Sequence, residues 1–145
     1  QVPNYGWDTH GDNFNGHASL MPRYDQAFAA MINDLRDRGL LEHVLVITLS
    51  EFGRTPRING HVGRDHWPEA WSLAMAGAGI RRGVVVGETN ALGTAVTSNE
   101  YDIGHLFHTW FRALGVDSQE TMYDNAGQPL PIAHDEHSAV EGVLA

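Results

Sequence analysis

Three short polar clusters carry side chains from which a metal site or a hydrolytic site could be built. The first is residues 6–13, GWDTHGDN, where Asp8 and His10 stand close together in the chain. A carboxylate and an imidazole are both common zinc ligands, so this pair could bind one divalent cation. The same octapeptide could equally form a polar turn, and the two interpretations predict different proteins.

The second cluster follows an apolar run. Glu51 comes shortly after residues 44–49, VLVITL, and Arg54 and Arg57 follow on the same loop. A carboxylate with arginines beyond the end of a strand suits either a metal ion or an anionic substrate. A local ion pair between Glu51 and Arg54 that closes the loop explains the pattern equally well.

The third cluster is residues 63–68, GRDHWP, with Asp65 and His66 adjacent. These side chains could supply one or two metal ligands, or the carboxylate could orient an imidazole that binds the metal. An exposed turn before Pro68 is the alternative interpretation.

Most of the remaining histidines are predicted to be structural or solvated, whereas His17 and His61 could lie near a site only if their loops fold inward. His105 and His108 stand three apart opposite an apolar helix stripe, so a solvated helix face is expected there. His134 and His137 flank two acids in a turn-rich tail, where only opportunistic metal binding is expected. His43 is predicted to be a loop residue.

Composition limits the possible partners. The 145 residues carry a formal net charge of −9, and all nine basic residues are arginines. Such an acidic chain repels phosphate backbones, which argues against nucleic acid as a partner. Clustered acids suit a divalent cation, although they could serve solubility alone. No cysteine is present, which excludes thiolate zinc sites, and no apolar run is long enough to span a membrane.

The elements expected to position these clusters follow an α/β pattern. Residues 1–18 read as a loop, and helical spacing of apolar residues predicts a helix over 19–38. The run 44–49 is typical of a strand buried on both faces of a parallel sheet. A further strand is predicted over 71–75 and a second helix over 101–114. The chain is thus expected to be one α/β domain over 1–145, or the C-terminal part of a larger one, with a turn-rich tail at 118–145.

The order of these motifs resembles a known family. The sequences GWDTHGDNFN, SEFGRTPR and GRDHWP, with the helix and strand between them, closely resemble bacterial DUF1501 proteins over residues 6–131. That family is often placed near the sulfatases in the alkaline-phosphatase-like superfamily. The resemblance implies a mostly parallel sheet flanked by helices, with divalent metals at the carboxyl ends of its strands.

The resemblance also implies a ligand set. Asp8 and His10 match the aspartate and histidine of one metal site, and His66 is the best match for a later histidine that returns to it. Glu51 matches an aspartate of a second site, and Asp65 would hold or orient an ion. Zinc is the metal most expected, with calcium, manganese and magnesium as alternatives.

Two departures from the superfamily pattern matter. Phe52 stands where the second site's histidine is expected. The superfamily's nucleophile and first metal-binding aspartate lie upstream, so the chain resembles only the C-terminal portion of a member and its nucleophile is unknown. A sheet truncated on its N-terminal side exposes an edge, which predicts a homo-oligomer or a missing N-terminal segment.

The function implied is hydrolysis of phosphate or sulfate esters by a metal-dependent enzyme, or by the C-terminal part of one. Arg54 would neutralise charge on a small anionic ester substrate. An exported location, periplasmic or extracellular, is expected of such a bacterial protein. The alternative is a non-catalytic metal-binding or assembly module that kept the fold.

Overall fold

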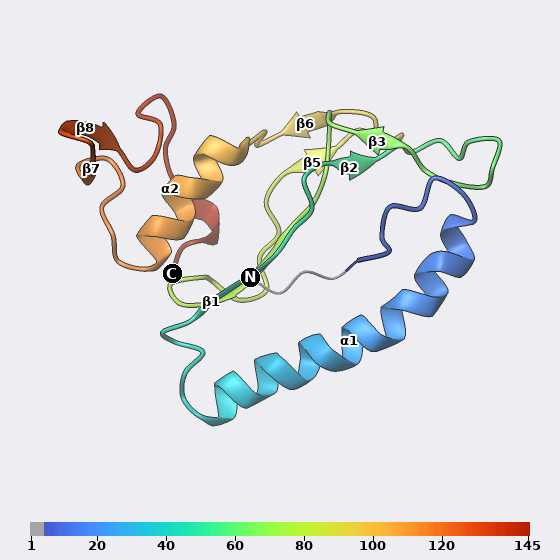
Figure 1. The fold of residues 1–145 in the computed structure, drawn as a ribbon, viewed down its shortest axis with the longest axis horizontal. Coiled ribbons are helices and arrows are strands. Elements are labelled where there is room, and N and C mark those ends of the chain that lie inside the picture. The colour runs from blue at the N-terminus through green and yellow to red at the C-terminus, as the bar shows by residue number, and fades with distance from the viewer. Residues whose placement is uncertain (1–4) are drawn as a thin grey trace.

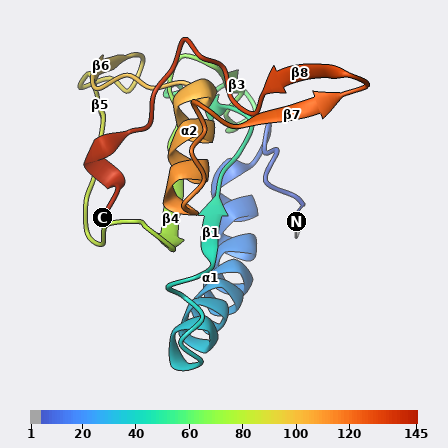
Figure 2. The same ribbon diagram turned by 90° about the vertical axis from the view of Figure 1, so that its left-hand side faces the viewer.

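The structure is a computed structural model that describes residues 5–145 as two α-helices and four two-stranded antiparallel sheets (Figures 1 and 2). The elements in chain order are α1 (Asn13–Asp37), β1 (Leu45–Thr48), β2 (Gly53–Arg54), β3 (His66–Trp67), β4 (Ala74–Gly77), β5 (Glu88–Thr89), β6 (Val96–Ser98), α2 (Ile103–Ala113), β7 (Met122–Asn125), β8 (Gln128–Pro131) and the 3-10 helix η1 (Glu141–Val143).

The expectation of an alkaline-phosphatase-like, mostly parallel sheet flanked by helices is wrong. Strand β1 pairs with β4 in antiparallel register, with Leu45 opposite Gly77 and Thr48 opposite Ala74. A parallel pair needs a crossover connection, usually a helix, whereas no helix lies between β1 and β4. The β1 residues are also only half-buried, so their apolar character does not reflect a strand covered on both faces.

Helix α1 confirms the first predicted helix but begins earlier, at Asn13 rather than near residue 19. Its start is fixed by contacts distant in sequence. The backbone N–H groups of Asp12 and Asn13 donate to the carbonyls of His61 and Val62, both at 3.0 Å. These contacts satisfy donors at the helix start, which have no partner within a helix. Part of the predicted loop is therefore helical, and residues 1–4 lie outside the described residues.

The apolar stripe of α1 is only partly covered. Tyr24 lies half-buried beside β1, where its hydroxyl and that of Thr48 form a hydrogen bond of 2.8 Å. The Tyr24 ring also stacks on Phe28 and meets Trp7 edge-on. Further along the same stripe, Met31 is exposed. Figure 1 shows α1 as a long rod at the edge of the molecule, consistent with this light packing.

The buried apolar residues gather around α2 and the chain that follows it. Residues 118–145 are more than a turn-rich tail, since they form β7, β8 and η1 and contribute to the core. The β7–β8 hairpin projects to one side of α2 (Figure 2). The buried apolar residues come from α2, from the turn after β4 and from this segment: Ala78, Leu106, Ala133, Val140 and Leu144.

His108 corrects a second expectation, that of a solvated face on α2. Its side chain is 1% exposed, and Thr109 beside it is fully buried. His108 Nδ1 lies 2.7 Å from the Ser118 hydroxyl, and Nε2 donates to the carbonyl of His134 at 2.6 Å. Both ring nitrogens are therefore satisfied, which allows this polar side chain to be buried.

Among the described residues, neither helix is long and apolar enough to cross a membrane.

Candidate metal centre

Asp8, His10 and His66 meet on the surface, although His66 is more than fifty residues from the other two in sequence. Asp8 Oδ1 lies 2.9 Å from His10 Nε2 and 3.0 Å from His66 Nε2. The two Nε2 atoms are 3.1 Å apart. Three potential ligand atoms thus face one point, and each belongs to an exposed residue that solvent can reach.

The β2–β3 pair delivers two of the side chains around Asp8. Arg54 is directly opposite His66 in the antiparallel register, so both side chains lie on the same face of the ribbon. Arg54 Nη2 lies 2.6 Å from Asp8 Oδ1. Arg54 therefore pairs with Asp8 rather than closing its own loop through Glu51.

The N-terminal loop is held against residues 59–64 by close backbone contacts. The Arg64 N–H donates to the Thr9 carbonyl at 3.1 Å, and the Asn59 side-chain amide donates to the His10 carbonyl at 3.0 Å. A Cβ atom added to Gly63 would lie only 2.0 Å from the His10 carbonyl oxygen. Residue 63 must therefore be glycine for His10 to occupy its observed position.

Asp65 and Asn59 support His10 from behind. Asp65 Oδ1 lies 2.7 Å from His10 Nδ1 and also accepts from the Asn59 side-chain amide at 3.1 Å. The side-chain oxygen Oδ1 of Asn59 accepts the backbone N–H groups of His61 and Gly63, each at 2.9 Å. Sequence reasoning missed Asn59. The available signal was the turn dipeptide Asn59-Gly60 just before the GRDHWP cluster.

The tautomer of a neutral His10 ring follows from its contact with Asp65. An ionised carboxylate can only accept, so neutral His10 donates from Nδ1 and its Nε2 carries a lone pair. That lone pair faces Asp8 Oδ1, which is also an acceptor, at 2.9 Å. Two acceptors at this distance repel unless a proton or a cation lies between them. The arrangement is therefore one that a shared cation would stabilise.

The spacing of the three atoms fits a small tetrahedral ion. Zinc lies about 2.0–2.1 Å from nitrogen and oxygen ligands, so neighbouring ligand atoms in a tetrahedral site are about 3.3 Å apart. The observed separations of 2.9, 3.0 and 3.1 Å are slightly shorter. A modest outward movement of these exposed side chains would accommodate the ion and leave a fourth position open.

Phe52 packs against the site rather than contributing a ligand. Its ring centroid lies 4.0 Å from that of His66, with the two planes tilted by 32°. The Arg54 guanidinium lies 5.7 Å from the same ring. Phe52 thus restricts the orientation of His66 at the position where the resemblance implied a histidine.

Hydrogen bonds keep both carboxylates of the site ionised. The contact with His66, followed by that with Arg54, lowers the pKa of Asp8 to about 2 from 3.8. The hydrogen bond with His10, followed by that with Asn59, lowers the pKa of Asp65. In both residues the favourable contacts outweigh desolvation, which acts in the opposite direction.

Glu51 is not brought into the group. It lies exposed in the bend between β1 and β2. Within residues 5–145, its side chain takes part in no recorded hydrogen bond or ion pair. The structure thus gathers Asp8, His10, Arg54, Asp65 and His66, and leaves Glu51 apart.

A second group, Asp102, His105 and His137, also has ligand atoms close enough to share an ion. Sequence reasoning missed it because His105 was expected on a solvated helix face and His137 in a tail. The spacing of Asp102 and His105 at a predicted helix start was the one available signal. The contribution of His137 depends on how the chain after α2 folds back.

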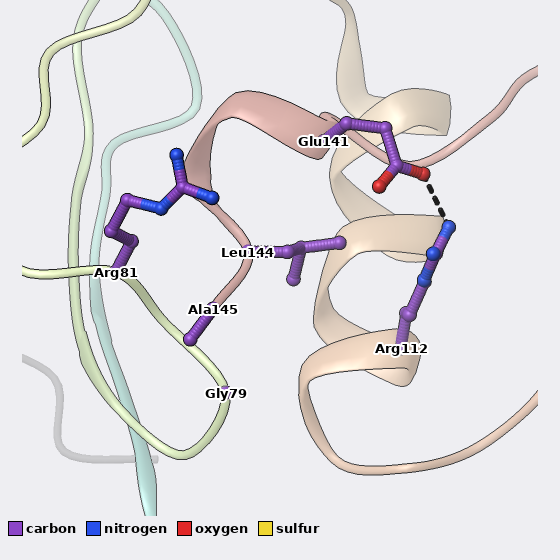
Figure 3. Close-up of a pocket in the computed structure, with 6 residues that line it drawn as sticks. All are labelled: Gly79, Arg81, Arg112, Glu141, Leu144 and Ala145. Carbon is purple, nitrogen blue, oxygen red and sulfur yellow. Dashed lines mark hydrogen bonds and ion pairs between the residues drawn. The ribbon is translucent and has the colours of Figure 1, made fainter.

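Neither described cavity coincides with a metal-ligating group. One, of about 310 Å³, lies between the turn after β4, α2 and η1 (Figure 3). In it Arg112 is ion-paired with Glu141, while Arg81 lies on the opposite wall. The other, of about 160 Å³, lies near Leu41 and Gly77. The Asp8 group is therefore an open surface site rather than an enclosed pocket.

Comparison with known proteins gives one family match. A family model described as "Protein of unknown function (DUF1501)" matches residues 1–144. No curated protein and no solved structure matches the chain significantly.

Proposed function

The chain belongs to the DUF1501 family, and from this premise we propose that it is a metal-dependent hydrolase of phosphate or sulfate esters, or the C-terminal part of one. The observation that carries the proposal is the convergence of Asp8 Oδ1 and the Nε2 atoms of His10 and His66 within 3.1 Å of one another. The carboxylate of Asp65 behind His10 adds the support that metal-binding histidines usually have.

Zinc is the proposed metal. Two imidazole nitrogens and one carboxylate oxygen form a typical catalytic zinc set, which leaves the fourth position for water or substrate. Calcium and magnesium prefer sites made of oxygen ligands, so they suit this group less well. Manganese remains an alternative because it accepts both ligand types.

The side chains around the ion have separate tasks. A divalent cation bound here would polarise an ester and activate water for attack. Asp65 holds the proton on His10 Nδ1, which keeps Nε2 available as a ligand. Arg54, with Nη2 2.6 Å from Asp8, adds a permanent positive charge beside the group. That charge favours an anionic substrate and stabilises charge that develops during hydrolysis.

The choice of phosphate or sulfate esters rests on the proposed kinship with the sulfatases and alkaline phosphatases. It is supported by the order of the Asp8, His10 and His66 motifs along the chain and by Arg54 at the group. An exported location is proposed on the same resemblance. Fractionation of the native host, with detection of the chain in the periplasm or medium, tests that location.

The function is tested by metal analysis and turnover on one preparation. The chain is loaded with zinc, freed of excess ion, and assayed for bound metal and for hydrolysis of p-nitrophenyl phosphate and sulfate. The His66→Ala variant should lose both the ion of this site and turnover. The His43→Ala variant, which alters an exposed loop histidine, should retain both. Failure of the unaltered chain to bind metal and to hydrolyse either ester would contradict the proposal.

A non-catalytic metal-binding or assembly module is the second candidate. It is favoured by the large apolar side chains left on the surface, among them Val85, which is 92% exposed, and Leu92, which is 74% exposed. Apolar surface of this kind often marks an association site. Zinc binding without turnover, together with a mass above that of a monomer, would support this alternative over the hydrolase.

A further inference from the structure

A second group of ligand atoms lies at the start of α2. Asp102 Oδ1 is 3.0 Å from His105 Nδ1, and Asp102 Oδ2 is 2.9 Å from His137 Nε2. The two imidazole rings meet edge to face with their centroids 4.8 Å apart. About a quarter of each histidine side chain remains exposed, so the group is shielded yet open to an ion.

The first turn of α2 fixes one side of this group. Asp102 is the N-cap residue, and its Oδ1 accepts the N–H groups of Gly104 at 2.9 Å and His105 at 3.3 Å. Oδ2 is left to face His137. A Cβ atom on Gly104 would lie 2.6 Å from atoms of the His137 ring, so that ring packs directly on the helix backbone.

Two hydrogen bonds fix the other side by holding the segment around His137 on α2. Before His137, the carbonyl of His134 accepts from His108 Nε2 at 2.6 Å. After it, the N–H of Val140 donates to the buried hydroxyl of Thr109 at 2.9 Å. His137 lies between these anchors, which limits how far it can move from Asp102.

Only one nitrogen of His137 can reach an ion. Its Nδ1 is buried and has no hydrogen-bond partner among residues 5–145, whereas Nε2 faces Asp102. His105 Nδ1 faces the Asp102 carboxylate, an acceptor, and the Asp102 N–H, a donor at 3.3 Å. A single nitrogen cannot satisfy both in one protonation state. Protein contacts alone therefore leave both imidazoles imperfectly paired.

Among the described residues, no permanently charged side chain forms an ion pair with the Asp102 carboxylate. Within the described residues, its recorded ion-pair partners are His105 and His137, and neither carries a permanent charge. The ionised carboxylate offsets the positive end of the helix dipole, which by itself disfavours a cation.

We propose that Asp102, His105 and His137 form a second divalent-cation site, and that the bound ion ties the segment after α2 to the start of this helix. One carboxylate and two imidazoles select zinc or a similar transition-metal ion over calcium or magnesium. The site is distinct from the Asp8 group. In Figure 1, α2 lies toward one end of the molecule's long axis and the start of α1 toward the other.

Zinc stoichiometry of the full chain tests this site independently of any catalytic activity. Isothermal titration with zinc should give two ions per unaltered chain and one for His105→Gln. Glutamine is well suited to the third position of a capping box, so this variant keeps α2 capped while removing the imidazole. Asp102→Asn, which also preserves a good N-cap, should likewise bind one ion. The His43→Ala control should bind two.

The first site provides the second arm of the experiment. His66→Ala should bind one ion, and His66→Ala combined with His105→Gln should bind none. Far-UV circular dichroism checks that each variant keeps its helices. The proposal is overturned if His105→Gln and Asp102→Asn bind as many ions as the unaltered chain, or if His66→Ala alone abolishes all binding. An unaltered chain that binds one ion, which His105→Gln removes and His66→Ala does not, would contradict the proposed hydrolase and support this second site.

Discussion

Asp65 shows how one carboxylate can determine the ligand character of a neighbouring histidine. Its hydrogen bond with His10 Nδ1, at 2.7 Å, leaves Nε2 free to face Asp8. Replacing such a supporting carboxylate typically lowers metal affinity about 10- to 100-fold. We therefore expect Asp65→Ala to weaken zinc binding at the first site by that factor, measured by competition with a chromophoric chelator. Asp65→Asn, whose amide oxygen can still accept from His10, should recover part of the affinity. Equal affinities for all three chains would contradict this role.

Asp8 gives a pH dependence whose sign follows from its lowered pKa. Because the folded-state pKa is about 2 and the ordinary value is 3.8, the contacts of Asp8 stabilise the fold fully above about pH 4. That contribution is lost as the pH falls from 4 to 2. Without metal, the Asp8→Asn variant should therefore show a shallower fall in melting temperature than the unaltered chain over this range.

The Asp8 measurement should be made at low ionic strength, because the side chain is exposed and salt screens its ion pair with Arg54. Asp25→Asn, at an exposed residue on α1, is a suitable control and should follow the unaltered chain. Parallel melting curves for Asp8→Asn and the unaltered chain would mean that these contacts do not stabilise the fold.

Residue types and spacing identified most of the first group but not its geometry. Asp8, His10, Asp65 and His66 were recognisable as candidates because each cluster places a carboxylate close to an imidazole, although a polar turn explained the same residues. Their pairing across more than fifty residues could not be read from the sequence, which is why Asp65 was left as either ligand or support. Glu51 follows the end of β1, but β1 pairs antiparallel with β4. The end of β1 therefore lies beside the start of β4, and no second strand ends there to bring further ligands to Glu51.

At the scale of elements, Gly63 couples the loop before α1 to the β2–β3 pair. The Gly63→Ala variant would place Cβ about 2.0 Å from the His10 carbonyl, so one loop must move. We expect a loss of stability of about 1–3 kcal/mol, typical of overpacking, and loss of the ion at the first site. Chemical denaturation and zinc titration measure the two effects.

Gly60→Ala is the matched control for Gly63→Ala, because a Cβ at Gly60 meets nothing within 4 Å. It should behave as the unaltered chain does in both measurements. Retention of the first ion by Gly63→Ala would show that His10 does not need the close backbone contact.

Both helices were predictable from sequence apart from the start of α1, whereas the strand topology was not. Helix α2 carried a clear apolar stripe, and its bounds Ile103–Ala113 lie within the predicted range 101–114. Strand β1 carried a β-branched run, but such a run does not specify the direction of its partner. Strands β2 and β3 are two residues long each, too short for any periodic signal, and they depend on contacts with the N-terminal loop.

At the scale of the whole molecule, the buried core is small for the chain. Only five apolar residues are buried among those described. On α1, Phe14 is 57% exposed and Met21 47% exposed, and seven residues are nearly two helical turns, so both lie on one face. Because exposed apolar side chains on one helix face favour association, we propose that this face of α1 pairs with a second copy of the chain.

Self-association through α1 can be measured directly by light scattering coupled to size-exclusion chromatography. The unaltered chain should elute at a mass of at least twice the 15.9 kDa of a monomer. The double variant Phe14→Gln and Met21→Gln should shift toward the monomer, because glutamine keeps helix propensity while removing apolar surface. Gln26→Ala, elsewhere on the exposed surface of α1, should leave the mass unchanged. A monomeric unaltered chain at high micromolar concentration would contradict the pairing, because Phe14 and Met21 would then stay exposed to water.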